Sequence, residues 1–186
     1  MALLICGLLI WSMVHLLPAA GAPLRAALIG RLGLNAYKGL FALLILGSVV
    51  LMVLGWRATA PTYLYTLPPL LQSLALALVV VAFILMGAAN YPTRIKRVVR
   101  HPQLTGLTLW ALAHLLLNGD SRSLILFGGL GSWAIVEMIF INRRDGQWLK
   151  PEAPSWSKEI IGVVISLIIL AAVVWAHPYI AGVPVR

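Results

Sequence analysis

Long apolar runs separated by short polar segments are the feature that most constrains the fold of this chain. The runs extend from about Leu3 to Leu17, Tyr37 to Trp56, Leu67 to Ala89, Leu104 to Leu117, Leu124 to Ile141 and Ile160 to Trp175. A helix needs about 20 apolar residues to cross the hydrocarbon core of a bilayer, and it satisfies its own backbone hydrogen bonds there. We therefore expect an all-α fold, a polytopic transmembrane helical bundle with about six spans, that forms a single domain over residues 1–186.

The composition excludes an ordinary soluble domain. Hydrophobic residues make up 61% of the 186 residues and charged residues only 10%, whereas soluble domains carry about 25% charged residues. The net charge of +9 does not indicate nucleic-acid binding, because the sequence has no solvated basic domain or face. The single cysteine, Cys6, excludes an intrachain disulfide and a cysteine metal cluster.

The positive charges alternate between the segments that separate the runs. Eleven of the 14 follow the first, third and fifth runs: Arg25, Arg31 and Lys38, then Arg94, Lys96, Arg97 and Arg100, then Arg143, Arg144, Lys150 and Lys158. Basic loops stay on the cytoplasmic side of the inner membrane. This count predicts six spans, with the three basic loops in the cytoplasm and both termini in the periplasm.

Two segments near the N-terminus allow alternative interpretations. The first run could be a cleaved signal peptide, because small residues follow Pro18. A signal peptide usually begins with basic residues, however, and no Lys or Arg precedes this run. The segment from Pro23 to Lys38 has leucines at helical spacing between basic residues. It is either an interfacial helix or an ordinary basic loop.

The four histidines, His15, His101, His114 and His177, all lie in or at the edge of an apolar run. Polar groups in hydrocarbon are costly unless they are paired or bound, so these residues are candidate ligands. His101 and His114 are 13 residues apart, about 20 Å along a helix, and cannot share one metal ion. The face that carries His114 also presents Leu107, Trp110 and Ala111. It is either a cofactor wall or part of the core.

The fifth run contains two further features. Glu137 lies well inside it, one turn after Trp133, and we expect the carboxyl group to be protonated or paired, with a structural role or a role in orienting a ligand histidine. The small residues Gly128, Gly129, Gly131 and Ser132 precede it. Small residues at this spacing let membrane helices approach closely.

The sequence resembles the NnrU family of bacterial membrane proteins and its plant relative, zeta-carotene isomerase. The resemblance covers most of the chain and rests on Arg100, His101, Pro102, Gln103, Gly106, Trp110, Leu112, Ala113 and His114, with support from His15 and from Ala176, His177 and Pro178. The family is named for a link to the expression of nitrite and nitric oxide reductases.

The resemblance implies a membrane protein that holds haem b between two axial histidines, which are His15 and His114 in this sequence. By their depth in the membrane, His101 and His177 remain alternative ligands. Leu107, Trp110 and Ala111 are the residues expected beside the cofactor. The plant isomerase carries a cysteine three residues before its second histidine, where this sequence has Ala111. The alternative ligand of that enzyme is therefore absent.

Several functions remain open from the sequence. A haem protein of this type would serve nitrogen-oxide metabolism, with nitric oxide as ligand, or isomerise a lipophilic polyene. The Arg-His-Pro segment also resembles one found in membrane methyltransferases that act on isoprenylcysteine or phospholipid. Those enzymes usually carry two paired glutamates toward the C-terminus, whereas the acidic residues after the fifth run here, Asp145, Glu152 and Glu159, are widely separated. A third possibility is a membrane partner protein without a cofactor.

Overall fold

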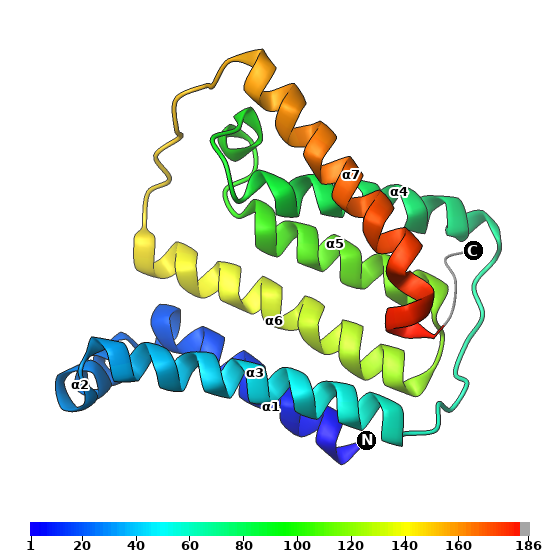
Figure 1. The fold of residues 1–186 in the computed structure, drawn as a ribbon, viewed down its shortest axis with the longest axis horizontal. Coiled ribbons are helices and arrows are strands. Elements are labelled where there is room, and N and C mark those ends of the chain that lie inside the picture. Colours follow the sequence, from blue (N-terminus) through cyan, green and yellow to red (C-terminus); the bar gives the residue numbers. More distant parts are fainter. Residues whose placement is uncertain (183–186) are drawn as a thin grey trace.

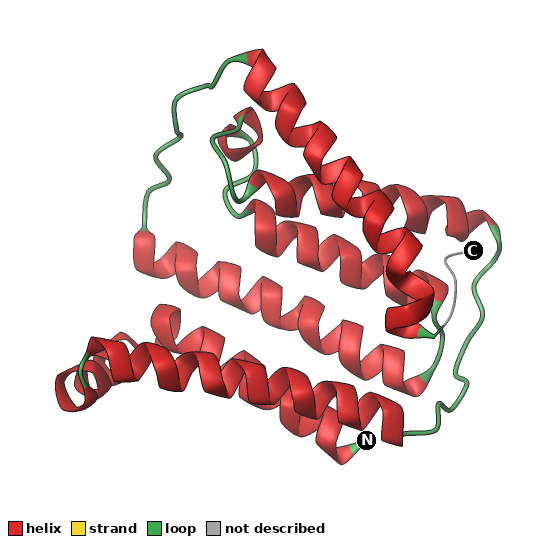
Figure 2. Cartoon of the chain, in the orientation of Figure 1, coloured by secondary structure: helices red, strands yellow, loops and turns green. Residues whose placement is uncertain are grey.

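The computed structural model describes residues 1–182, which are helical almost throughout (Figure 2). The helices are α1 (Ala2–Ala20), α2 (Ala22–Leu32), α3 (Leu34–Ala58), α4 (Leu70–Ala88), α5 (Pro102–Leu117), α6 (Ser121–Asp145) and α7 (Trp156–Ala181), with one 3-10 turn, η1 (Arg94–Arg97). Among them α1, α3, α4, α6 and α7 are long and apolar enough to cross a membrane. The expected all-helical membrane bundle is confirmed for the part of the chain that the structure describes.

Besides these five helices, α5 is also apolar but has only 16 residues. It corresponds to the short run from Leu104 to Leu117 in the sequence. It packs along both α4 and α6, and Figure 1 shows it between these two longer helices. Because protein covers much of its surface, α5 does not need to match the full thickness of the hydrocarbon layer by itself.

The helices follow one another across the bundle in an order that differs from their order in the sequence. Figure 1 shows α1 and α3 at one edge, then α6, then α5, with α4 and α7 at the other edge. Helix α6 contacts both α1 and α5, so it lies between them. The segments with eleven positive charges, which include α2, η1 and the loop 146–155, gather at one end, as the charge count predicts (Figure 1).

The N-terminal segment after α1 is helical, which excludes an ordinary loop. Helix α2 begins with Pro23 in its first turn, has no buried residue and ends at Gly33, whose φ of 80° favours glycine. Helix α3 follows at once. A helix without buried residues at the basic end of the bundle fits the interfacial helix that the leucine spacing predicts.

Two predicted helix ends were too early. We expected Pro18 and Pro178 to end the first and last spans, but α1 continues to Ala20 and α7 to Ala181. Each proline lies in the last turn of its helix, where it removes one backbone hydrogen bond and leaves the few residues after it helical.

Glycines occupy the places where helices approach most closely. A Cβ atom added at Gly7 of α1 would lie 2.7 Å from the Ser48 carbonyl oxygen of α3, and one added at Gly55 would collide with the backbone of Leu4. At Gly106 of α5 an added Cβ would lie 2.7 Å from the Ala82 carbonyl oxygen of α4. These contacts are too short for any larger residue.

The turn before α6 is held by a charged cap. The Asp120 carboxylate accepts hydrogen bonds from the backbone N–H groups of Arg122 and Ser123 and from the Ser123 hydroxyl. Burial by itself raises the pKa of Asp120, but these hydrogen bonds and the Arg122 charge outweigh it and lower the pKa below its ordinary value. Arg122 in turn donates to the carbonyl oxygens of Trp56 and Thr59 at the end of α3.

We predict that Gly55→Leu destabilises the protein by about 3 kcal/mol, because α1 and α3 must separate to admit the side chain. Gly47→Leu on the same helix is the matched control, since an added Cβ there meets nothing within 4 Å. Thermal aggregation of the purified protein in detergent would measure both. Equal aggregation temperatures for the two variants would contradict the close contact.

Asp120→Ala is expected to cost about 1 kcal/mol through loss of the helix cap. Because folding lowers the pKa of Asp120, its charged form stabilises the protein above the unfolded pKa, and this contribution is lost as the pH falls through the folded pKa. Asp120→Asn keeps the cap without the titration. Unfolding measured against pH in detergent should therefore show a weaker acid dependence in the asparagine variant than in the unaltered protein.

Candidate functional site

His15 lies half-buried between α1, α3 and α6. Its Nδ1 atom is 3.0 Å from the Trp11 carbonyl oxygen one turn earlier. The ring centroid is 4.1 Å from the Trp11 ring, 5.0 Å from the Trp133 ring and 5.8 Å from the Phe41 ring. Aromatic rings from three helices therefore surround this imidazole.

His114 has the same local geometry on α5. Its Nδ1 atom is 2.8 Å from the Trp110 carbonyl oxygen. The imidazole centroid lies 4.4 Å from the Trp110 ring and 4.4 Å from the Phe127 ring of α6. Both candidate ligands are thus held one turn after a tryptophan, with an aromatic residue of α6 against the ring.

The backbone contacts determine what each histidine can do chemically. A carbonyl oxygen only accepts, so each Nδ1 carries the hydrogen and donates it, and the neutral ring then has its lone pair on Nε2. No hydrogen bond reaches Nε2 of His15 or His114 from residues 1–182. This is the tautomer that binds a metal through Nε2, with a backbone oxygen fixing the ring.

The two histidines lie against different parts of α6. Trp133, beside His15, and Phe127, beside His114, are six residues apart, which is about 9 Å along the helix and about 120° around it. His114 and His177 of α7 interact electrostatically. His101 is bound elsewhere, with Nε2 2.8 Å from the Asn142 side-chain oxygen.

Within residues 1–182 no three His, Cys, Asp or Glu side chains lie together as a metal-binding group. A metal ion held by protein ligands alone is therefore not supported in this part of the chain. One or two imidazoles are the number that a haem iron takes from a protein, since the porphyrin supplies the other ligands. The fit to haem rests on the Nε2 atoms of His15 and His114.

The expected cofactor wall on α5 is divided between two roles. Trp110 contacts His114 and Phe127, with 5.1 Å between the two aromatic centroids. Ala111 is 1% exposed. A Cβ atom added at Gly131 of α6 would lie 3.2 Å from the Ala111 Cβ, so Ala111 packs α5 against α6. Leu107 is half-buried.

Glu137 forms no hydrogen bond or salt bridge with any residue in the described chain, and one of its carboxylate oxygens is buried without a partner. Of the two expected states, protonated or paired with a histidine or arginine, the paired one is therefore absent from residues 1–182; Arg144, two turns further on, acts on Glu137 only electrostatically. Tyr37 and Trp133 also have buried polar atoms without partners. We did not single out these two residues, because an aromatic residue in an apolar run gives no sign of an unpaired polar atom.

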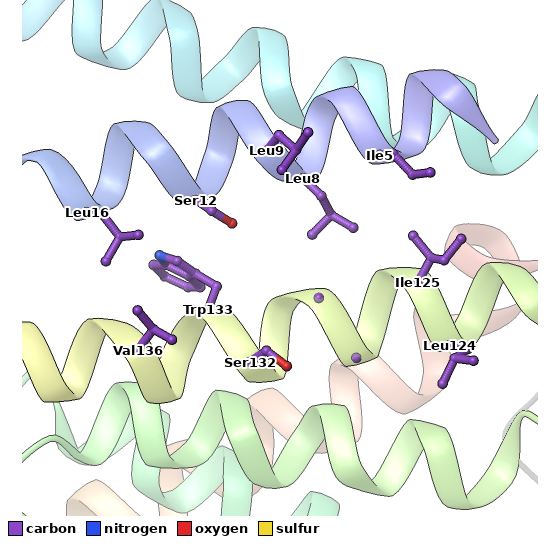
Figure 3. A pocket seen from close by; sticks show the side chains of 12 residues that line it. Ile5, Leu8, Leu9, Ser12, Leu16, Leu124, Ile125, Ser132, Trp133 and Val136 are labelled. Atoms are coloured by element: carbon purple, nitrogen blue, oxygen red, sulfur yellow. The ribbon is translucent and has the colours of Figure 1, made fainter.

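An apolar groove lies between α1 and α6 (Figure 3). Its volume is about 510 Å³, and its floor on α6 is formed by Gly128, Gly129 and Ser132. Gly129 contacts Leu8 and Gly131 contacts Ala111, which confirms helix packing as the role of these glycines, whereas nothing lies within 4 Å of a Cβ added at Gly128. Trp133 lines the groove and also contacts His15.

The Arg-His-Pro-Gln segment lines a smaller hollow at the basic end of the bundle. It has a volume of about 220 Å³ and includes Lys96, Arg100, His101, Pro102 and Gln103. The cations are used locally: the Lys96 Nζ donates to the carbonyl oxygens of Ala89 and Tyr91, and Arg100 donates to that of Gly146. The segment thus joins the end of α4 to the end of α6.

A buried carboxylate fastens the same segment to α7. Glu159 is 8% exposed and accepts a hydrogen bond from the Thr93 hydroxyl at 2.6 Å and from the Arg94 backbone N–H at 2.7 Å. The Arg94 guanidinium lies over the Trp156 ring, 4.2 Å from its centroid. Both α7 residues lie in its first turn, so they hold η1 against that helix.

Comparison with known families finds one match that spans almost the whole chain. The family described as NnrU protein matches residues 3–185. No curated protein and no solved structure matches the chain.

Glu159→Ala is expected to cost about 2 to 3 kcal/mol, because the Thr93 hydroxyl and the Arg94 N–H lose a charged acceptor. The segment between α4 and α5 should then become more accessible to protease. Glu152→Ala, on an exposed loop residue, is the control. Limited proteolysis in detergent, with the cleavage sites identified by mass spectrometry, would test this; unchanged protection of residues 89–101 would contradict it.

Proposed function

This chain belongs to the NnrU family, and from that membership and its two aromatic-flanked imidazoles we propose that this multi-pass membrane protein binds haem b. The observation that carries the proposal is the shared geometry of His15 and His114, each with Nδ1 on a carbonyl oxygen of the preceding turn and with no hydrogen bond to Nε2 from residues 1–182. These two residues would hold the haem iron. His177, which interacts electrostatically with His114, is the alternative partner.

The surroundings of the histidines favour a large apolar ligand. Trp11, Phe41 and Trp133 cover the His15 ring, and Trp110 and Phe127 cover the His114 ring. These residues would exclude water from an iron and keep both imidazoles oriented. When bound, haem would supply an iron that changes oxidation state and binds small molecules such as nitric oxide.

We assign the haem protein to nitrogen-oxide metabolism, the process for which the family is named. A second candidate, isomerisation of a lipophilic polyene, is favoured by the groove between α1 and α6. This groove is apolar, and one of the residues that line it, Trp133, also contacts His15. A long apolar molecule could occupy it.

The proposed location is the bacterial inner membrane, with α2, η1 and the 146–155 loop in the cytoplasm. Eleven of the 14 positive charges lie in these segments and at the adjoining helix ends. Positively charged segments are retained on the cytoplasmic side during insertion. Both termini would then face the periplasm.

Absorption spectra of the protein purified after haem-replete expression would test the proposal. We expect a Soret band that shifts on reduction, and we expect His15→Ala and His114→Ala each to lose it or change its position. His101→Ala is the control, because the Nε2 atom of His101 is already bound to Asn142. A band lost in His177→Ala but retained in His15→Ala would contradict the assignment of His15.

Absence of the band in the unaltered protein would contradict haem binding. Binding of S-adenosylmethionine, measured by calorimetry on the same sample, would then favour a methyltransferase. Adding nitric oxide or a carotenoid to the haem-loaded protein separates the two functions, because only the first shifts the Soret band through a new iron ligand.

A further inference from the structure

Within residues 1–182, four buried polar side-chain atoms on the helices around His15 have no hydrogen-bond partner. They are Nε1 of Trp11, the Tyr37 hydroxyl, Nε1 of Trp133 and Oε2 of Glu137. They come from α1, α3 and α6, the three helices that surround His15. Three of the four are N–H or O–H groups that can donate a hydrogen bond.

Burial makes the absence of partners costly. Tyr37 and Trp133 are each 7% exposed and Glu137 is 8% exposed. A buried polar group without a hydrogen bond destabilises a protein, and hydrocarbon offers no water as a substitute. Several such groups around one imidazole therefore indicate a ligand that accepts their hydrogen bonds.

Two of the unpartnered atoms belong to rings that contact His15 directly, and the other two belong to residues one turn away from such rings. The rings of Trp11 and Trp133 contact His15 directly, with their own centroids 5.5 Å apart. Tyr37 is one turn before Phe41, the third ring against His15, and the Tyr37 and Phe41 centroids are 6.3 Å apart. Glu137 is one turn after Trp133.

Positive charge adjoins the donors on the side of the basic end of the bundle. The Arg25 guanidinium carbon lies 5.7 Å from the Tyr37 ring centroid. Arg144, which forms an ion pair with Asp145 at 2.7 Å, acts electrostatically on Glu137 and donates to the Pro18 carbonyl oxygen near the end of α1. Two guanidinium groups therefore lie toward the basic end, one beside Tyr37 and one that acts on Glu137.

Hydrogen-bond donors beside guanidinium groups bind anionic oxygen atoms, such as those of a carboxylate. A carboxylate is a simple anionic group for an otherwise apolar metal-binding ligand. We propose that Tyr37 and Trp133, with Trp11 beside them, bind the carboxylate groups of the ligand whose metal His15 binds. This inference rests on the proposed function, so the carboxylates are the two propionates of haem b, directed toward Arg25 and Arg144. Glu137 pairs with a propionate through one shared proton, as two neighbouring carboxyl groups do.

Two porphyrins that differ only in these carboxylates provide the test. The apoprotein in detergent is titrated with ferric protoporphyrin IX and with its dimethyl ester, and binding is followed by the Soret band. We expect the diacid to bind the unaltered protein more tightly than the ester. Tyr37→Phe and Trp133→Phe should each raise the Kd of the diacid about tenfold more than the Kd of the ester, because the charge-assisted hydrogen bond that each variant removes is made to the diacid alone.

The controls are Tyr63→Phe and Trp175→Phe, whose side chains are 68% and 74% exposed. The ester also reports folding, because a variant that fails to fold loses both porphyrins. Equal affinity of the unaltered protein for the diacid and the ester, or equal weakening of both porphyrins in the folded variants, would overturn the inference while leaving haem binding intact. If the unaltered protein binds neither porphyrin, the proposed function and this inference both fail.

Discussion

Close approach of helix backbones at small residues is the constraint on which the rest of this structure depends. In a bilayer the lipid tails are as apolar as leucine, so helices associate through tight packing and polar contacts. Here the α1–α3 contact uses Gly7 and Gly55, the α4–α5 contact uses Gly106, and the α5–α6 contact uses Gly131 against Ala111. Large apolar side chains remain on the outside, where they face lipid.

Polar contacts at the two ends then fix the helices along their axes. At one end the Asp120 cap and the Arg122 guanidinium connect the start of α6 to the end of α3. At the basic end Glu159 holds η1 against the start of α7, and Arg100 reaches the end of α6. These contacts hold the ends of α3 and α6, and of η1 and α7, in register.

Helix α6 organises the candidate site because it lies between the helices that carry these two histidines. Its aromatic residues Phe127 and Trp133 each pack against one imidazole, while its small residues line the groove. A carboxylate-bearing porphyrin would satisfy both the Nε2 of His15 and the unpaired donors around it. The same helix would thus contribute to metal binding, to the propionate site and to the apolar groove.

The helices, their approximate ends and the position of most positive charges at one end of the bundle could be predicted from the amino-acid sequence. Apolar runs of membrane length and the charges between them depend only on local composition, which the chain carries directly. Local spacing also revealed the histidines and the packing role of Gly129 and Gly131. The predictions that needed no partner from elsewhere in the chain were therefore the ones that the fold confirmed.

The contacts between side chains of different helices could be read from the three-dimensional structure alone. The structure put α6 between α1 and α5 and left Glu137 without a hydrogen-bond or salt-bridge partner among residues 1–182, where the sequence allowed either a protonated or a paired carboxyl group. Tyr37 and Trp133 became candidates for the same reason, since an unsatisfied hydrogen bond is a property of a three-dimensional environment. Helix order across a bundle is set by surfaces that match in space, and separation along the chain does not encode it.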